Sequence, residues 1–126
     1  MCQSASKPSN ESEIKCYRVY SLQNHPWVGI PTSYFLGHPI SKLREEIVAK
    51  NTPFHAFLTK DDVSKFINCG ATDKSLIFEC ILKNSLETGY WGSQRDIHTA
   101  TGYTLMVVRR VGSYTKKRKL YWYKAA

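Results

Sequence analysis

The chain of 126 residues carries 18 Lys or Arg against 10 Asp or Glu, a formal net charge of +8, and 42% of its residues are hydrophobic. This length and apolar content predict one folded domain and exclude a wholly disordered chain. No apolar run approaches the roughly 20 residues that cross a bilayer, and the start MCQSASKPSNESEIK has no hydrophobic signal-peptide core, so we expect an intracellular protein (cytoplasmic or nuclear, in its own cell or a host cell) with no membrane partner.

The first 13 residues are polar and rich in Ser, which predicts a disordered tail before a single domain spanning residues 14–126. The stretch IKCYRVYSL follows. In it, every second residue (Ile14, Cys16, Arg18 and Tyr20) alternates with a second set (Lys15, Tyr17, Val19 and Ser21), and this period of two predicts a strand. The next stretch, QNHPWVGIPTSYFLGHP, holds three prolines and two glycines and is expected to be a loop. Its aromatic residues predict that this loop packs on the body of the protein or lines a pocket.

Two helices are predicted. The first is PISKLREEIVAKN, with Ser41 as its N-cap. The second helix follows a short strand, TPFHAF. Thr59 is the N-cap of this helix, the helix dipole favours Asp61 and Asp62 in its first turn, and Gly70 ends it. The apolar face of the first helix would consist of Ile40, Leu43, Ile47 and Val48.

The second half of the chain is expected to be mostly strand. The apolar run KSLIFECILK predicts a buried strand, and NSLETGYWGSQRDIHTATG is interpreted as a long polar connection. YTLMVVRRVG predicts another strand. SYTKK is interpreted as a turn, after which RKLYWYK pairs back on that strand to form a β-hairpin. This irregular order of elements predicts an α+β fold, a mainly antiparallel sheet with two short helices and a C-terminal β-hairpin.

The motifs of several common enzymes and metal sites are absent. The four cysteines form no C-x-x-C pair and the histidines show no zinc-finger spacing, so we expect reduced thiols and no metal site. G-x-G-x-x-G, P-loop, G-x-S-x-G and H-E-x-x-H patterns do not occur either. This argues against the common nucleotide-hydrolysing, serine-hydrolase and zinc-hydrolase plans.

The positive charge is concentrated at the C-terminal end. Residues 101–126 hold seven Lys or Arg and no acid, whereas residues 1–100 hold 11 Lys or Arg against 10 Asp or Glu. Aromatic residues lie among these cations, and cations with aromatic faces are what a single-stranded nucleic acid binds. One hypothesis is therefore a non-enzymatic module that binds RNA, DNA or an acidic protein partner through a 109–124 hairpin; the alternative is a solvated hairpin that keeps the protein soluble. The residues concerned are Arg109, Arg110, Lys116, Lys117, Arg118, Lys119, Tyr121 and Trp122, with Tyr114, Tyr123 and Lys124 beside them.

Two charged residues interrupt predicted strands. Arg18 is interpreted either as an edge-strand residue that points to water or as a clamp for an anion at a cleft. Glu79 either faces solvent on a half-exposed sheet or is a partnered carboxylate in a cleft. A further alternative is a metal-free ribonuclease, which would use two histidines as base and acid. The chain offers His25, His38, His55 and His98 for this role.

Part of the chain resembles the ADP-ribosyltransferase-like domains. The resemblance rests on YRVYS, on a loop with VGI and GHP, on TPFHAFLTKDDVSKF and on SLIFECIL, and it spans Tyr17 to Leu82. In that family an opening strand carries an Arg or His after a Tyr, and a later strand leads at once into a helix and then an apolar strand. The resemblance implies binding of NAD or a related phosphate-bearing ligand.

The resemblance also implies roles for particular residues. Arg18 matches the Arg that contacts NAD, an aromatic ring such as Tyr34 or Trp27 would stack on the ligand, and His55 would line the pocket. The chain departs from the family at His55 and Ala56, where Ser-Thr-Ser is usual, and HTATGYTLMVVRRV lacks the catalytic glutamate. These departures favour a member that binds its ligand without reacting; any catalytic role would fall to Arg18, His55 or Glu79.

Overall fold

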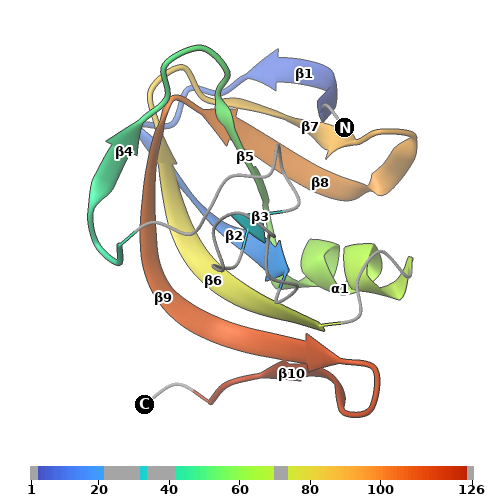
Figure 1. Cartoon of the computed structure of the whole chain (residues 1–126). Helices are drawn as coiled ribbons and strands as arrows, with labels where there is room; N and C mark the ends of the chain where they lie inside the picture. Colours follow the sequence, from blue (N-terminus) through green and yellow to red (C-terminus); the bar gives the residue numbers. More distant parts are fainter. Residues whose placement is uncertain (1–2, 22–31, 34–41, 70–73, 125–126) are drawn as a thin grey trace.

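The computed structural model describes residues 3–21, 32–33, 42–69 and 74–124, and these form a curved antiparallel sheet with one helix (Figure 1). The order along the sheet is β1-β7-β8-β5-β2-β6-β9-β10, while β3 pairs with β2 and β4 pairs with β9. The elements are β1 (Gln3–Pro8), β2 (Glu13–Ser21), β3 (Thr32–Ser33), β4 (Glu46–Val48), β5 (Phe54–Phe57), α1 (Lys60–Asn68), β6 (Lys74–Lys83), β7 (Glu87–Trp91), β8 (Gln94–Gly102), β9 (Thr104–Thr115) and β10 (Lys119–Trp122).

Strand β2 lies at the centre of this sheet. It pairs with β6 without interruption, from Glu13 opposite Lys83 to Ser21 opposite Ser75, and it meets β5 where Tyr17 lies opposite Phe57. A strand with partners on both edges has its backbone groups satisfied and its side chains buried on both faces. Five consecutive residues of β2, from Cys16 to Tyr20, are indeed buried.

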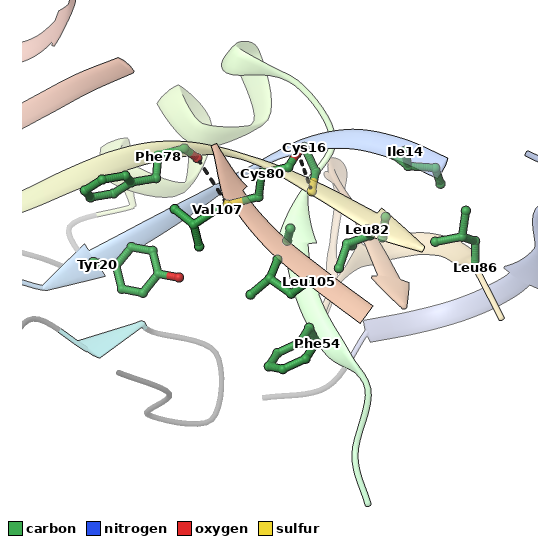
Figure 2. Packing of buried hydrophobic residues seen from close by; sticks show 12 residues of the cluster. Ile14, Cys16, Tyr20, Phe54, Phe78, Cys80, Leu82, Leu86, Leu105 and Val107 are labelled. Carbon is green, nitrogen blue, oxygen red and sulfur yellow. Dashed lines mark hydrogen bonds between the residues drawn. The ribbon is translucent and has the colours of Figure 1, made fainter. Parts of the chain in front are cut away.

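Side chains alternate between two faces of the sheet, and each face builds its own core. The face that α1 covers, here called the helix face, is formed by Val19, Phe57, Phe66 and their neighbours. The other face, here called the opposite face, is shown in Figure 2. Its buried residues are Ile14, Cys16, Tyr20, Phe54, Ala56, Phe78, Cys80, Leu82, Leu86, Ala100, Leu105 and Val107.

The helix α1 begins where the sequence predicts. The Thr59 hydroxyl accepts a hydrogen bond from the Asp62 amide at 3.2 Å, and the Asp62 carboxylate accepts one from the Thr59 amide at 3.0 Å. This reciprocal capping box satisfies two amides that a helix start leaves open. Val63, Phe66 and Ile67 then bury the helix against the sheet.

The α+β fold with two helices is wrong for the described chain, which is mostly antiparallel sheet with a single helix. The expected first helix is replaced by a turn and β4, with Arg44 at φ 63°. β4 takes its backbone hydrogen bonds from β9, with Ile47 opposite Leu105. Leu43 (53% exposed) and Val48 (68% exposed) form no buried face, so pairing with β9 overrides the helical pattern.

Two further expectations differ from the structure. The expected disordered tail contains β1, because Gln3–Pro8 pairs with the edge of β7. The expected polar connection is the β7–β8 hairpin, whose turn holds Gly92 at a φ of 52°. Its Thr, Tyr, Trp and Ile residues suit a half-exposed strand, so polarity alone does not indicate a loop. The strands predicted at IKCYRVYSL, TPFHAF, KSLIFECILK and YTLMVVRRVG are confirmed as β2, β5, β6 and β9, but β9 extends to Thr115, through the first three residues of the expected turn SYTKK.

Candidate functional site

The C-terminal hairpin is confirmed: β9 and β10 pair from Thr115 opposite Lys119 to Gly112 opposite Trp122. We call residues 109–124 the basic hairpin. The Arg118 amide donates to the Thr115 hydroxyl at 3.1 Å and so helps to close the turn. All seven cations of the basic hairpin are exposed, namely Arg109, Arg110, Lys116, Lys117, Arg118, Lys119 and Lys124.

Arg109 belongs to a cluster on the helix face. Its Nε lies 3.5 Å from Glu79 Oε2, and Lys15 Nζ lies 3.2 Å from Glu79 Oε1. Glu79 is therefore a partnered carboxylate between two cations, with only 13% of its side chain exposed. The hydrogen bond that Lys15 donates to Glu79 raises the pKa of Lys15 above its usual value, so this cation stays charged over a wide pH range.

Arg110 points the other way and meets two tyrosines. Its guanidinium carbon lies 5.2 Å from the centre of the Tyr123 ring, and the Tyr123 and Tyr121 rings lie 5.7 Å apart. Tyr121 is 54% exposed. A cation over one ring with a second exposed ring beside it presents charge and flat apolar surface together.

Trp122 does not join this group. It packs against the core of the helix face, with its ring 6.1 Å from that of Tyr17 and 5.2 Å from Lys60 Nζ. The period of two along β10 separates Trp122 from Tyr121. Tyr123, not Trp122, is the second aromatic residue beside Arg110.

Three hollows adjoin the basic hairpin and bring in cations that sequence reasoning missed. Lys74, Lys60 and Lys15 come from β6, α1 and β2, and no local motif links them to the hairpin. The described residues that line the hollows include ten cations and one carboxylate, Glu79. The ten cations are Lys15, Lys60, Lys74, Arg109, Arg110, Lys116, Lys117, Arg118, Lys119 and Lys124.

Arg18 lies in the interior, so its interpretation as an edge-strand residue facing water is wrong. Its side chain is 0% exposed, and its guanidinium carbon lies 5.6 Å from the ring centres of both Tyr20 and Phe54. Those two residues belong to the core of the opposite face. The central place of β2 explains the burial, because both edges of this strand are paired.

Arg18 and His55, which the family resemblance brings into one pocket, lie on different faces of the sheet. Phe54 belongs to the opposite face and Phe57 to the helix face, so alternation along β5 places the intervening His55 on the helix face. Arg18 therefore lies across the sheet from His55. Tyr34, Trp27, His25 and His38 lie outside the described residues. NAD binding stays a prediction that rests on Arg18 alone.

The two described histidines have different settings. His55 is 7% exposed, whereas the side chain of His98 is 58% exposed. His98 donates its backbone amide to Asp62 Oδ1 at 2.8 Å, and its ring Nδ1 lies 3.1 Å from the same oxygen. This contact ties β8 to the start of α1. The ribonuclease hypothesis likewise stays a prediction.

The part of the chain that the structure describes offers neither a metal-binding cluster nor a membrane-spanning helix. Within it, no three His, Cys, Asp or Glu residues gather closely enough to hold a metal ion. Its helix is too short and too polar to cross a membrane. Comparisons of the chain with family models, with curated proteins and with solved structures gave no match.

Proposed function

We propose that this protein binds single-stranded nucleic acid, RNA or DNA, through the basic hairpin. The observation that carries the proposal is the composition of the surface around residues 109–124, where ten cations and one carboxylate line three adjoining hollows. Phosphate neutralisation by Lys and Arg supplies most of the affinity in such complexes. A surface of this size and sign suits a polyanion better than a single charged group.

The tyrosines favour a single strand over a duplex. Base stacking on an aromatic face requires an unpaired base, and each stacked base contributes roughly 1–3 kcal/mol. Tyr121 offers an exposed ring, and Arg110 lies over the neighbouring Tyr123. A cation and two rings in one place serve the phosphate and the base of the same nucleotide.

The experiment measures fluorescence polarisation of a labelled single-stranded RNA and DNA at about 50 and about 200 mM salt. For single strands, the logarithm of the affinity falls against the logarithm of the salt concentration with a slope of about −0.7 per phosphate neutralised. A variant with Lys116, Lys117, Arg118 and Lys119 replaced by Ala loses four cations. Its slope should therefore be less steep by about 3.

A matched variant controls for net charge. Replacing Lys7, Lys42, Lys50 and Arg95 by Ala also removes four exposed cations, but none of these four lines the three hollows. The control should keep most of the affinity of the native chain. Equal losses in both variants, or tight binding of an acidic protein domain with none of RNA or DNA, would show that the basic hairpin is not a nucleic-acid site.

A further inference from the structure

The Arg18 guanidinium is a buried charge that lies against the Tyr20 and Phe54 rings and makes no hydrogen bond or ion pair with the described residues. The side chain is 0% exposed, and its Nε, Nη1 and Nη2 atoms make no hydrogen bond with the described residues. An arginine stays protonated in proteins, so this charge cannot be removed by losing a proton. Burying an unpaired ion costs several kcal/mol even after the protein relaxes.

The polar side chains in the core cluster of the opposite face, which surrounds Arg18, are neutral. Burial raises the pKa of Tyr20 and of Cys80 to about 12, and it raises the pKa of Cys16 well above its usual value. These groups stay protonated at neutral pH. Glu79 lies on the helix face, where Lys15 and Arg109 already bind it. The core cluster of the opposite face therefore supplies no counter-charge.

The remaining residues of the chain supply at most one acidic side chain. Residues 1–2, 22–31, 34–41, 70–73 and 125–126 contain a single Asp and no Glu, and that residue is Asp73. An anion from outside the chain would supply the missing counter-charge.

We infer that Arg18 is the anchor of a second site, which binds the carboxylate of a small apolar monocarboxylic acid. The planar guanidinium fork matches a carboxylate with two parallel hydrogen bonds. One carboxylate neutralises one guanidinium, whereas a phosphate dianion would leave an excess buried charge. Tyr20 and Phe54 flank the guanidinium, so the body of the ligand should be apolar or aromatic.

Phe54 indicates where such a ligand could enter. Its ring contacts Arg18 and also lines a hollow of about 400 Å³ at the surface. The other walls of the hollow come from residues 47–52, and Ile47 among them packs against the core of the opposite face. Phe54 thus lies beside both the buried charge and this surface hollow. This site is distinct from the basic hairpin, because none of the residues that line its hollow lines the three hollows beside the hairpin.

The test titrates benzoate and hexanoate, and separately inorganic phosphate, against the full chain at constant ionic strength. Calorimetry and the thermal unfolding midpoint report binding, and the NMR signal of the Arg18 Nε–Hε group reports its place. We expect the carboxylates to bind, to raise the midpoint and to shift this signal, with no effect of phosphate at equal concentration. The variant without Lys116, Lys117, Arg118 and Lys119 should bind the carboxylates as the native chain does.

Arg18→Met removes the charge and keeps an unbranched apolar side chain. It should weaken carboxylate binding at least tenfold and unfold at a higher temperature than the unliganded native chain. Carboxylate binding unchanged in Arg18→Met would overturn the inference. So would a loss of folding in this variant, which would mean that the chain itself partners the guanidinium, and so would a native chain whose Arg18 signal ignores both carboxylates.

Discussion

Tyr121 and Trp122 are neighbours in β10, yet their side chains lie on different faces of the sheet. Tyr121 is 54% exposed beside Tyr123, whereas Trp122 packs against the core of the helix face. The alternation of side chains along the strand thus places one aromatic residue on the exposed surface and the next against the core. This difference can be measured with two single substitutions.

Replacing Tyr121 by Ala should weaken binding of single-stranded RNA by about 5- to 150-fold, the equivalent of roughly 1–3 kcal/mol for one stacked base. The thermal unfolding midpoint should change little, because the ring is largely exposed. Fluorescence polarisation and a thermal melt on the same sample provide the two readouts. An unchanged affinity would remove Tyr121 from the proposed interface.

Replacing Trp122 by Ala should have the reverse effect. The half-buried ring contacts Tyr17 and Lys60, and its loss should lower the free energy of unfolding by about 2 kcal/mol. Urea unfolding measures this change. RNA affinity of the folded variant should stay within about twofold of the native value, which corresponds to roughly 0.4 kcal/mol. A large affinity loss with normal stability would instead assign Trp122 to the interface.

Asp62 should matter far more than its neighbour Asp61. The Asp62 carboxylate is buried and accepts hydrogen bonds from the Thr59 amide and hydroxyl and from the His98 amide. Asp62→Ala leaves these donors open and should cost about 2–4 kcal/mol in urea unfolding.

Asp61→Ala provides the matched comparison. Asp61 is exposed and pairs with Lys65 one helical turn away at 3.2 Å. Losing such a surface pair and one charge near the helix start should cost at most about 1 kcal/mol. Similar costs for the two variants would mean that the contact between α1 and β8 contributes little to stability.

Ser85→Gly should stabilise the protein. Asn84 and Ser85 both have positive φ angles, 67° and 52°, in the turn that leads from β6 to β7. Serine is strained in this region and glycine is not, so the substitution should add about 0.5–1 kcal/mol after the greater freedom of the unfolded chain is counted. A higher urea midpoint with unchanged slope is the expected readout. A lower midpoint would show that the Ser85 side chain itself is needed.

Alkaline pH should destabilise the fold. Burial raises the pKa of Cys80 from 9.0 to about 12 and that of Tyr20 from 10.0 to about 12. Both groups are neutral when folded, so their contribution is complete below pH 9 and is lost as the pH rises toward 12. Each group should lower the free energy of unfolding by up to about 1.4 kcal/mol per pH unit in this window.

Urea midpoints measured from pH 7 to pH 11 test this dependence. Tyr20→Phe removes one of the titrating groups and should make the decline less steep. A stability that stays flat to pH 11 in the native chain would mean that the thiol and the phenol ionise while the protein remains folded.

Local signals in the sequence predict part of this fold well. The capping residue Thr59 with Asp62 three residues later specifies the start of α1, and the run of apolar residues in β6 specifies a buried strand. Both signals are complete within about ten residues. The basic hairpin was found in the same way, from a turn between two strands.

Long-range pairing decides the rest and leaves little trace in the sequence. The local sequence around β4 predicts a helix, but these residues form a strand because they pair with β9, where Ile47 lies opposite Leu105. The local sequence of β1 predicts disorder, but these residues form a strand because they pair with β7. The candidate site shows the same limit. Lys15 and Lys74 lie near the basic hairpin because of the order of strands in the sheet, and Lys60 because α1 packs on the helix face. Arg18 is buried because β2 is central.

The central pairing of β2 with β6 also sets when this chain can fold. Cys16 and Cys80, which lie opposite each other, are 64 residues apart in sequence. Closing so long a loop lowers the conformational entropy of the chain before the contacts between β2 and β6 can lower its free energy, and this slows folding. At a synthesis rate of about 5–20 residues per second, β6 is made about 3–13 s after β2. During this interval the aromatic residues of β2 are unpaired, and they need protection from aggregation until β6 emerges.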